Sequence, residues 1–214
     1  TKLDFVTFAS TGNATSFGTG TSNNGGTGLN NSTRGVFAIA TVNTLEYITI
    51  ASLGNAVDFG DMNDPLSQEA AMNSPTRGVI AGGYGPSPYP HPATAEYLTT
   101  ATLGSSSYFG DLSQSVSAAG GGGNAVRGLV MGGKIFPSPT VYYNVIQYFT
   151  MASLGNAVDF GDLTEARSQN GVASSPTRAV SMGGNQPSSD VDVIDYVEIM
   201  TTGNAVDFGN LLAA

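Results

Sequence analysis

The chain has 214 residues and no cysteine, and 16 acidic side chains against 7 basic ones give it a formal net charge of −9. This charge disfavours nucleic acid and anionic membranes as partners, and the absence of cysteine excludes disulfides, thiolate nucleophiles and thiolate metal sites. No stretch approaches the ~20 consecutive apolar residues that span a bilayer, so we expect one soluble domain over residues 1–214.

The composition favours short strands and turns over helices. Only 11% of the residues are charged, well below the usual quarter, and Gly, Ser, Thr and Asn fill the difference. The first residues lack the apolar core of a signal peptide, and the chain begins at Thr1 without a Met, which leaves a processed product or a piece of a longer protein open.

The first predicted element is a hairpin over residues 3–18, LDFVTFASTGNATSFG, and its pattern returns four times, starting at residues 45, 95, 146 and 194. In the second copy, LEYITIAS alternates between two faces as a strand requires, and Gly54-Asn55 predicts a tight turn before a strand over residues 56–59. The marker glycines Gly12, Gly54, Gly104, Gly155 and Gly203 lie 42, 50, 51 and 48 residues apart.

A second pattern lies between the copies of the first. It reads STRGVFAIA, PTRGVIAGG, AVRGLVMGG and PTRAVSMGG, and a small-residue strand such as residues 170–174 precedes it. Each period therefore holds about four short strands. We expect units at about 3–44, 45–94, 95–144 and 145–192, with a partial unit at 193–214, and Pro/Ser-rich variable loops within 83–95 and 133–141.

The segment GNAVDFGDLTEARSQNGVASSPTRAVSMGG resembles a kelch repeat, with a strand that ends in an aromatic, an Ala-Arg link, a small-residue strand and an apolar strand closed by Gly-Gly. This resemblance implies an all-β, kelch-like propeller of four to five four-stranded blades, one of them incomplete. The combination of TRGVFAGG-like and GNAxDFGDL-like motifs is similar to repeats in virion structural proteins of tailed phages, notably those of marine cyanobacteria.

The chain departs from kelch proteins in having no tryptophan. Four phenylalanines stand where kelch repeats carry it: Phe59, Phe109, Phe160 and Phe208. The hairpin pattern occurs five times and the Gly-Gly pattern four times, so an incomplete fifth blade, a four-bladed ring with an extra hairpin and a fragment of a longer propeller all fit.

Charged residues recur at fixed positions of the repeat. The arginines are Arg34, Arg77, Arg127 and Arg178; one aspartate position holds Asp58, Asp159 and Asp207, and a second holds Asp61, Asp111 and Asp162. One interpretation is a ring of ligand-binding groups. The favoured interpretation is structural, in which each Arg bonds a carboxylate or turn carbonyls and fixes one unit against the next.

The Asp-Phe-Gly-Asp segments suggest a weak Ca²⁺ site, because Asp58 with Asp61, or Asp159 with Asp162, could offer two carboxylates. The spacing lacks the dense acidic pattern of a calcium loop, so solvated or Arg-paired carboxylates are favoured. No cofactor is predicted. Residues 120–123, four glycines in a row, lack the Gly-Lys-Ser/Thr of a phosphate loop and are interpreted as a flexible turn.

The variable loops carry the residues that we predict to contact a partner: Tyr84, Tyr89, His91, Phe136 and Tyr142. Aromatic faces could stack there on sugars or on a protein, or could simply cover sheet edges. No nucleophile motif accompanies His91, the single histidine, so we expect no enzyme.

The resemblance implies a virion or extracellular protein, a component of a tail, fibre or surface appendage that presents loops for host attachment or assembly. The expected partners are other virion proteins, further copies of the chain, or a host glycan or receptor. The alternative is a secreted or cell-surface glycan-binding propeller.

Overall fold

The computed structural model describes residues 1–21, 26–86, 91–136 and 139–213. Over these ranges the chain forms twenty strands in six antiparallel sheets and no helix, which confirms the all-β prediction. No helix in the described ranges is long and apolar enough to cross a membrane.

Four sheets have four strands each and contain them in chain order, except that β13 and β14 are left out of the third. The first holds β3 (Thr27–Asn30), β4 (Arg34–Ala38), β5 (Thr44–Thr49) and β6 (Val57–Asp61), and the second holds β7 (Ala70–Asn73), β8 (Arg77–Ala81), β9 (Thr94–Thr99) and β10 (Ser107–Asp111). The third holds β11 (Gly120–Gly123), β12 (Arg127–Met131), β15 (Val145–Thr150) and β16 (Val158–Asp162). The fourth holds β17 (Gly171–Ser174), β18 (Arg178–Met182), β19 (Val193–Glu198) and β20 (Val206–Asn210).

Two sheets are two-stranded hairpins. The first pairs β1 (Lys2–Phe5) with β2 (Thr15–Thr19) and precedes the first four-stranded sheet, and the second pairs β13 (Lys134–Ile135) with β14 (Val141–Tyr142). The sequence patterns predicted the β5–β6 hairpin and the weak strand β17 close to their observed bounds.

The sheets do not coincide with the units expected from the sequence. In each sheet the strand that begins with the recurring arginine pairs with the first strand of the hairpin pattern that follows it: β4, β8, β12 and β18 pair with β5, β9, β15 and β19. The four sheets therefore run from 27 to 61, 70 to 111, 120 to 162 and 171 to 210. The last hairpin belongs to a complete sheet, and the sheet of two strands lies at the N-terminal end, in place of the partial unit expected at 193–214.

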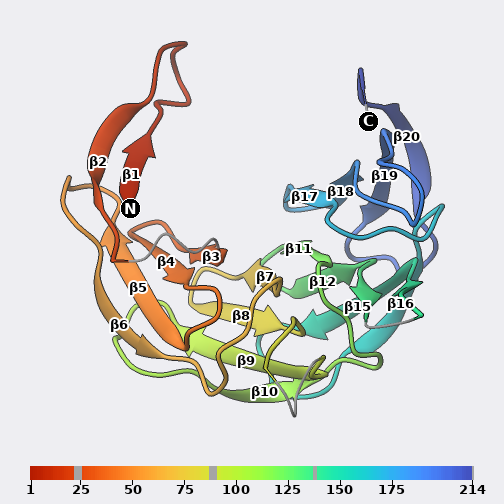
Figure 1. Cartoon of the computed structure of the whole chain (residues 1–214), viewed down its shortest axis with the longest axis horizontal. Helices are drawn as coiled ribbons and strands as arrows, with labels where there is room; N and C mark the ends of the chain where they lie inside the picture. Colours follow the sequence, from red (N-terminus) through yellow and green to blue (C-terminus); the bar gives the residue numbers. More distant parts are fainter. Residues whose placement is uncertain (22–25, 87–90, 137–138, 214) are drawn as a thin grey trace.

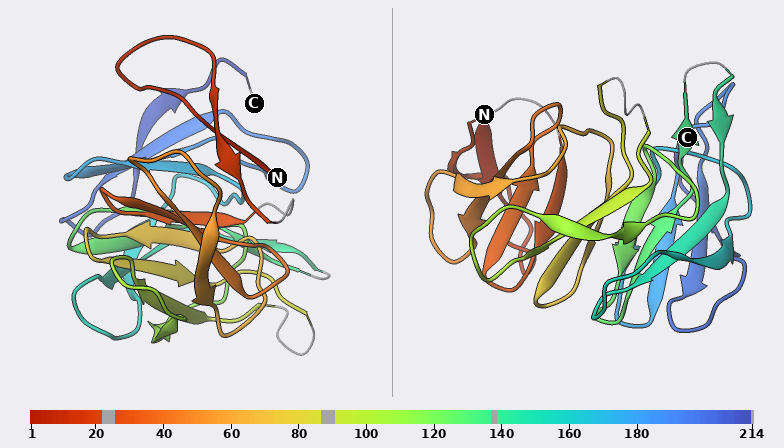
Figure 2. Two further views of the ribbon diagram at one scale, coloured as in Figure 1. Left: turned by 90° about the vertical axis from the view of Figure 1, so that its left-hand side faces the viewer. Right: turned by 90° about the horizontal axis from the view of Figure 1, so that it is seen from below.

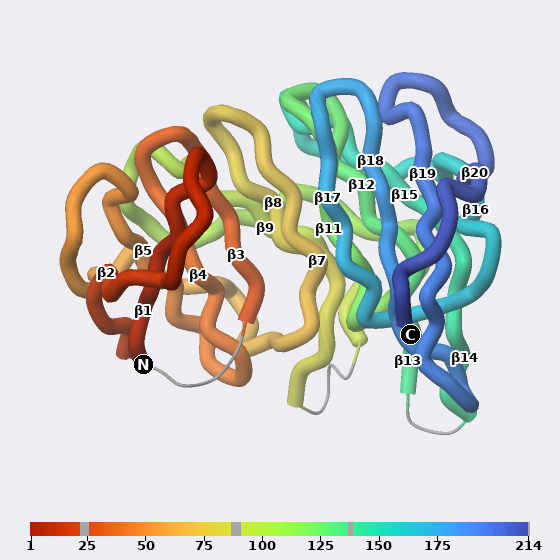
Figure 3. Tube along the Cα trace, turned by 90° about the horizontal axis from the view of Figure 1, so that it is seen from above, coloured from red at the N-terminus to blue at the C-terminus, as the bar shows by residue number. Residues whose placement is uncertain are grey.

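The sheets stand side by side in an arc (Figure 1). Strands β3, β7, β11 and β17 line its inner side, strands β6, β10, β16 and β20 lie outside, and the arc stays open between the β1–β2 hairpin and the fourth sheet. Figure 2 shows the arc from two further sides, and Figure 3 shows from above that the order of the sheets follows the chain.

The apolar core lies between neighbouring sheets as three separate clusters. Val36 and Phe59 of the first sheet pack with Ile80 of the second. The second and third sheets meet around Phe109 and Phe149, and the third and fourth meet around Phe160 and Val197 in the same way. Stacking of sheets, each burying one face against the next, thus holds the arc together.

The four glycines at 120–123 form strand β11, so the interpretation as a flexible turn is wrong. The strand lies between β7 and β17, where a Cβ on Gly121 would come within 2.3 Å of Ala71 O and one on Gly120 within 2.4 Å of the Val172 side chain. Glycine is needed here because the neighbouring backbones leave no room for a side chain.

Candidate binding surface and the contacts between sheets

Three of the predicted loop residues come together in space. The ring centroids of Tyr84 and Phe136 are 4.6 Å apart. The ring centroid of His91 lies 5.4 Å from that of Tyr84 and 4.8 Å from that of Phe136. The Phe136 N–H donates to His91 Nε2 at 3.0 Å. Tyr84 follows β8 and Phe136 follows β13, so the contact joins segments that lie 52 positions apart in the sequence.

A cation extends this group of rings along the β13–β14 hairpin. Lys134 Nζ lies 5.8 Å from the Phe136 ring centroid and 5.6 Å from that of Tyr142, which pairs with Lys134 across the hairpin. The Tyr142 hydroxyl donates to Asn185 Oδ1 at 3.1 Å. We call Tyr84, His91, Lys134, Phe136 and Tyr142 the aromatic loop surface; β13 and β14 lie at one edge of the arc (Figure 3).

The aromatic loop surface offers ring faces and one positive charge. Tyr84 is exposed, His91, Phe136 and Tyr142 are half-buried, and His91 Nδ1 is buried without a hydrogen-bond partner in the described part of the chain. Tyr89, the fifth residue predicted for contact, lies outside the described residues. Aromatic rings beside a cation can stack on a flat apolar or sugar face and bond its polar groups.

The recurring arginines connect neighbouring sheets. Three of the four arginines donate from Nη1 to a main-chain carbonyl of the next sheet. These bonds are Arg34 to Thr100 (3.1 Å), Arg77 to Met151 (2.9 Å) and Arg127 to Ile199 (3.0 Å). Each guanidinium also lies over a tyrosine of its own sheet, at Tyr47, Tyr97, Tyr148 and, for Arg178, Tyr196, with distances of 4.3 to 4.9 Å. Arg178, in the last sheet, instead bonds Glu198 at 2.7 Å, which raises the pKa of the guanidinium.

The recurring aspartates do not pair with these arginines. Asp58, Asp159 and Asp207 are exposed, and Asp207 accepts a bond from the Gly209 N–H at 3.0 Å. Asp111 accepts a bond from the exposed Tyr108 hydroxyl, and this bond raises the pKa of that hydroxyl. Asp61 and Asp162 end β6 and β16, in sheets that are not neighbours. Among the described residues no three His, Asp or Glu side chains form a group that could hold a metal ion.

In four of the hairpins the turn, which reads Gly-Asn-Ala or, at residues 104–106, Gly-Ser-Ser, binds the outer strand of the sheet before it. The turn glycine donates to a phenylalanine carbonyl, in the pairs Gly54 to Phe17 (3.0 Å), Gly104 to Phe59 (2.8 Å), Gly155 to Phe109 (2.9 Å) and Gly203 to Phe160 (2.7 Å). A side chain of the turn accepts in return, as when Asp111 N–H donates to Asn156 Oδ1 at 3.0 Å. The strongest motif of the sequence therefore serves to join the sheets.

Sequence reasoning missed a buried hydrogen-bond acceptor in every four-stranded sheet. Glu46, Glu96, Gln147 and Asp195 each accept a bond from the N–H of a residue that follows the outer strand of the sheet before: Thr21, Asn63, Ser113 and Thr164. The signal was present, because a polar residue precedes the aromatic in each of LEY, AEY, IQY and IDY. The alternation of the strand places that polar residue on the face opposite the aromatic, but it does not show that this face is buried.

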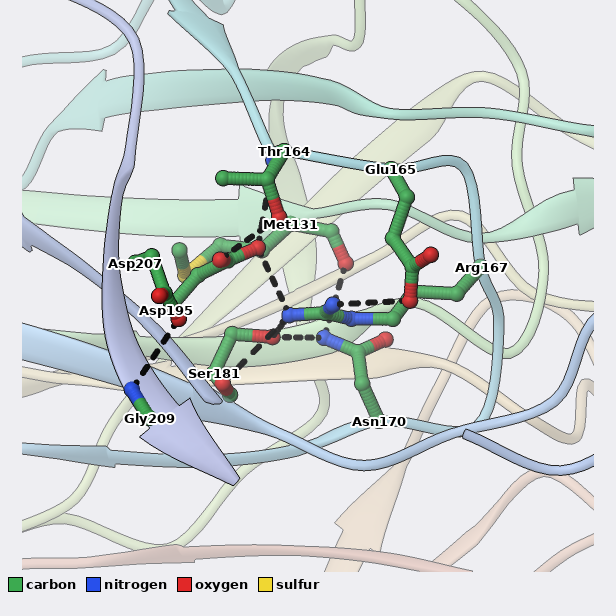
Figure 4. A network of polar contacts seen from close by, with 9 residues as sticks. All are labelled: Met131, Thr164, Glu165, Arg167, Asn170, Ser181, Asp195, Asp207 and Gly209. Atoms are coloured by element: carbon green, nitrogen blue, oxygen red, sulfur yellow. Dashed lines mark hydrogen bonds and ion pairs between the residues drawn. The ribbon is translucent and has the colours of Figure 1, made fainter. Parts of the chain in front are cut away.

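Between the third and fourth sheets the acceptor belongs to a larger polar network (Figure 4). Arg167 Nη2 donates to Asp195 Oδ2 at 2.9 Å, and both side chains have no exposed surface. Glu165 lies 3.6 Å from Arg167 Nη1, and Asn170 donates to Ser181 Oγ at 2.8 Å. The Arg167–Asp195 ion pair is buried among main-chain and hydroxyl partners. Such buried pairs occur in structural contacts as well as in functional sites.

No family model and no curated protein matches this chain.

Proposed function

We propose that this chain is a non-enzymatic structural protein built as a kelch-like β-propeller, which uses its aromatic loop surface to bind a partner. Four four-stranded sheets in an arc, joined by the same backbone and arginine contacts at each step, support the propeller. The observation that carries the binding role is the convergence of Tyr84, His91 and Phe136 from two variable loops.

The repeated charged groups contribute to structure and leave the loops for recognition. Three of the four arginines are engaged with carbonyls of the next sheet, and the buried acceptors bond the loops of the sheet before. A scaffold held in this way can vary its loops without losing its fold. The similarity of the TRGVFAGG-like and GNAxDFGDL-like motifs to phage virion proteins supports a place in a tail, fibre or surface appendage.

Alanine substitution tests this proposal in phage particles that carry the chain. Replacing Tyr84, Phe136 and Tyr142 together by Ala should reduce particle assembly or host adsorption by about tenfold or more, since buried aromatic anchors dominate interfaces. The matched control is Tyr108→Ala, because Tyr108 is an exposed tyrosine on β10, away from the loops. Unchanged assembly and adsorption in the triple variant would contradict the proposal.

The second candidate is a glycan-binding propeller, favoured by the Tyr84 and Phe136 rings beside the Lys134 ammonium. Binding of one sugar class to the isolated protein on a glycan array, lost on Tyr84→Ala, would establish it. No binding to any sugar would favour the virion scaffold.

A further inference from the structure

Strand β1 has an open edge. In the described residues it pairs with β2 alone, whereas its counterparts β5, β9, β15 and β19 each have partners on both sides. The partner on the corresponding side is always a strand that begins with arginine, paired as Arg34 with Thr49, Arg77 with Thr99, Arg127 with Thr150 and Arg178 with Glu198. An unpaired strand edge is a template for another strand.

An apolar hollow lies beside this open edge. Its volume is about 640 Å³, and its lining includes Leu3, Phe5, Phe8, Phe37, Ile48 and Ile50. A second hollow of about 360 Å³ shares Leu3 and Phe37 with it. Between the first and second four-stranded sheets the corresponding space is filled. There Ile80, the counterpart of Phe37, packs in one cluster with Val36 of the first sheet.

The aromatic ring of β1 also lacks its cation. Tyr47, Tyr97, Tyr148 and Tyr196, the counterparts of Phe5, each lie under the guanidinium of the paired strand. No arginine or lysine lies over Phe5 in the described part of the chain, and 39% of the side chain is exposed. The open edge, the hollow and the ring without a cation are all explained by the absence of one strand that begins with arginine, as β4, β8, β12 and β18 do.

We propose that β1 is a docking edge for an extended polypeptide segment from outside residues 1–214, of the type Arg-(Gly/Ala)-(Val/Leu)-x-(Ala/Met). By the register of the four complete sheets, its arginine lies opposite Thr7 and over Phe5, its glycine or alanine opposite Val6, and its apolar residue faces Phe5 and fills the hollow. A small residue stands opposite the counterpart of Val6 in all four sheets: Gly35, Gly78, Gly128 and Ala179.

A folded second copy is not the partner. The four strands of this type, β4, β8, β12 and β18, already have strands on both sides within their own sheets. This inference concerns the N-terminal end of the arc and does not depend on the role proposed for the aromatic loop surface.

The test uses the whole chain and a fluorescent synthetic peptide with the sequence AVRGLVMGG, which is residues 125–133 of the protein. Saturable binding is expected, with loss of about tenfold or more in affinity when the peptide arginine is replaced by alanine. A scrambled peptide that binds equally well, or no binding up to about 1 mM, would overturn the proposal.

A pair of fully exposed residues provides matched protein variants that do not endanger folding. Phe8 lines the hollow, and Leu212 lies at the other end of the chain. Phe8→Ser should weaken peptide binding by about threefold to tenfold, while Leu212→Ser should leave it unchanged. Bound peptide should also slow hydrogen exchange at residues 2–5, and slowing confined to other strands would contradict the assignment.

Discussion

Arg167 occupies a position that is apolar elsewhere in the repeat. Its counterparts in the two preceding connections are Leu66 and Val116, both buried, and the counterparts of Asp195 are Glu96 and Gln147. The third interface thus replaces an apolar contact by an ion pair with no exposed surface. Buried ion pairs add little net stability, yet removing one partner is costly because the other charge stays buried.

Arg167→Ala should lower the free energy of unfolding by about 3 to 5 kcal/mol, because Asp195 would keep a buried charge without its cation. Urea unfolding at neutral pH measures the change.

The double variant Arg167→Val with Asp195→Gln copies the residues of the preceding interface, Val116 and Gln147. It should recover stability to within about 1 kcal/mol of the wild type. If the double variant is as unstable as the single one, the pair does not explain the loss.

Glu69 is another buried carboxyl, and its Oε2 has no hydrogen-bond partner in the described part of the chain. Burial raises the pKa of its carboxyl above 4.5, and the nearby Glu96 raises it further. Since the folded state holds this proton more tightly than the unfolded state, stability from Glu69 is present below pH 4.5 and is lost as pH rises through the folded pKa.

Glu69→Gln should therefore stabilise the protein at neutral pH, and its advantage over the wild type should shrink as pH falls towards 4.5. Unfolding free energies of both proteins across this range measure the difference, with Asp58→Asn at an exposed position as the control. An advantage that does not change with pH would contradict the assignment.

At the scale of elements, each segment of the repeat has a definite structural task. The hairpin strand supplies a buried acceptor on one face and an aromatic on the other, and the turn binds the sheet before it. The sheets converge towards the inside of the arc, where β11, a strand of four glycines, contacts both β7 and β17.

Gly121→Ala should lower the free energy of unfolding by about 3 kcal/mol, because its Cβ would collide with the backbone of Ala71. The matched control is Gly28→Ala at the same position of the first sheet, where the nearest atom would be Val36 O at 3.9 Å. Gly28→Ala should stay within about 0.5 kcal/mol of the wild type in thermal or urea unfolding. Equal losses in both variants would show that the inner strands are equally crowded.

At the scale of the whole molecule, a residue's place in the arc decides its burial. Phe160 and Phe208 stand at one position of the same motif, and each forms an edge contact with a tyrosine of its own sheet, with centroids 6.0 and 5.9 Å apart. Phe160 is 2% exposed and Phe208 57% exposed, because no sheet follows β20 in the structure.

Phe160→Ala should therefore cost about 3 to 5 kcal/mol of unfolding free energy, and Phe208→Ala less than about 1 kcal/mol. Chemical unfolding of the two variants under one set of conditions provides the comparison. A similar loss in both would mean that another surface covers Phe208 in solution.

The sequence alone predicted an all-β fold, the strands of the hairpin pattern and their turns, because alternation and Gly-Asn signals are local. It also placed Tyr84, His91 and Phe136 in variable loops. Only the tertiary structure decided which strands share a sheet, that residues 120–123 form a strand, and that Glu46, Glu96, Gln147 and Asp195 are buried acceptors. Pairing, crowding and burial depend on neighbours tens of residues away, and a local pattern carries no information about where those neighbours lie.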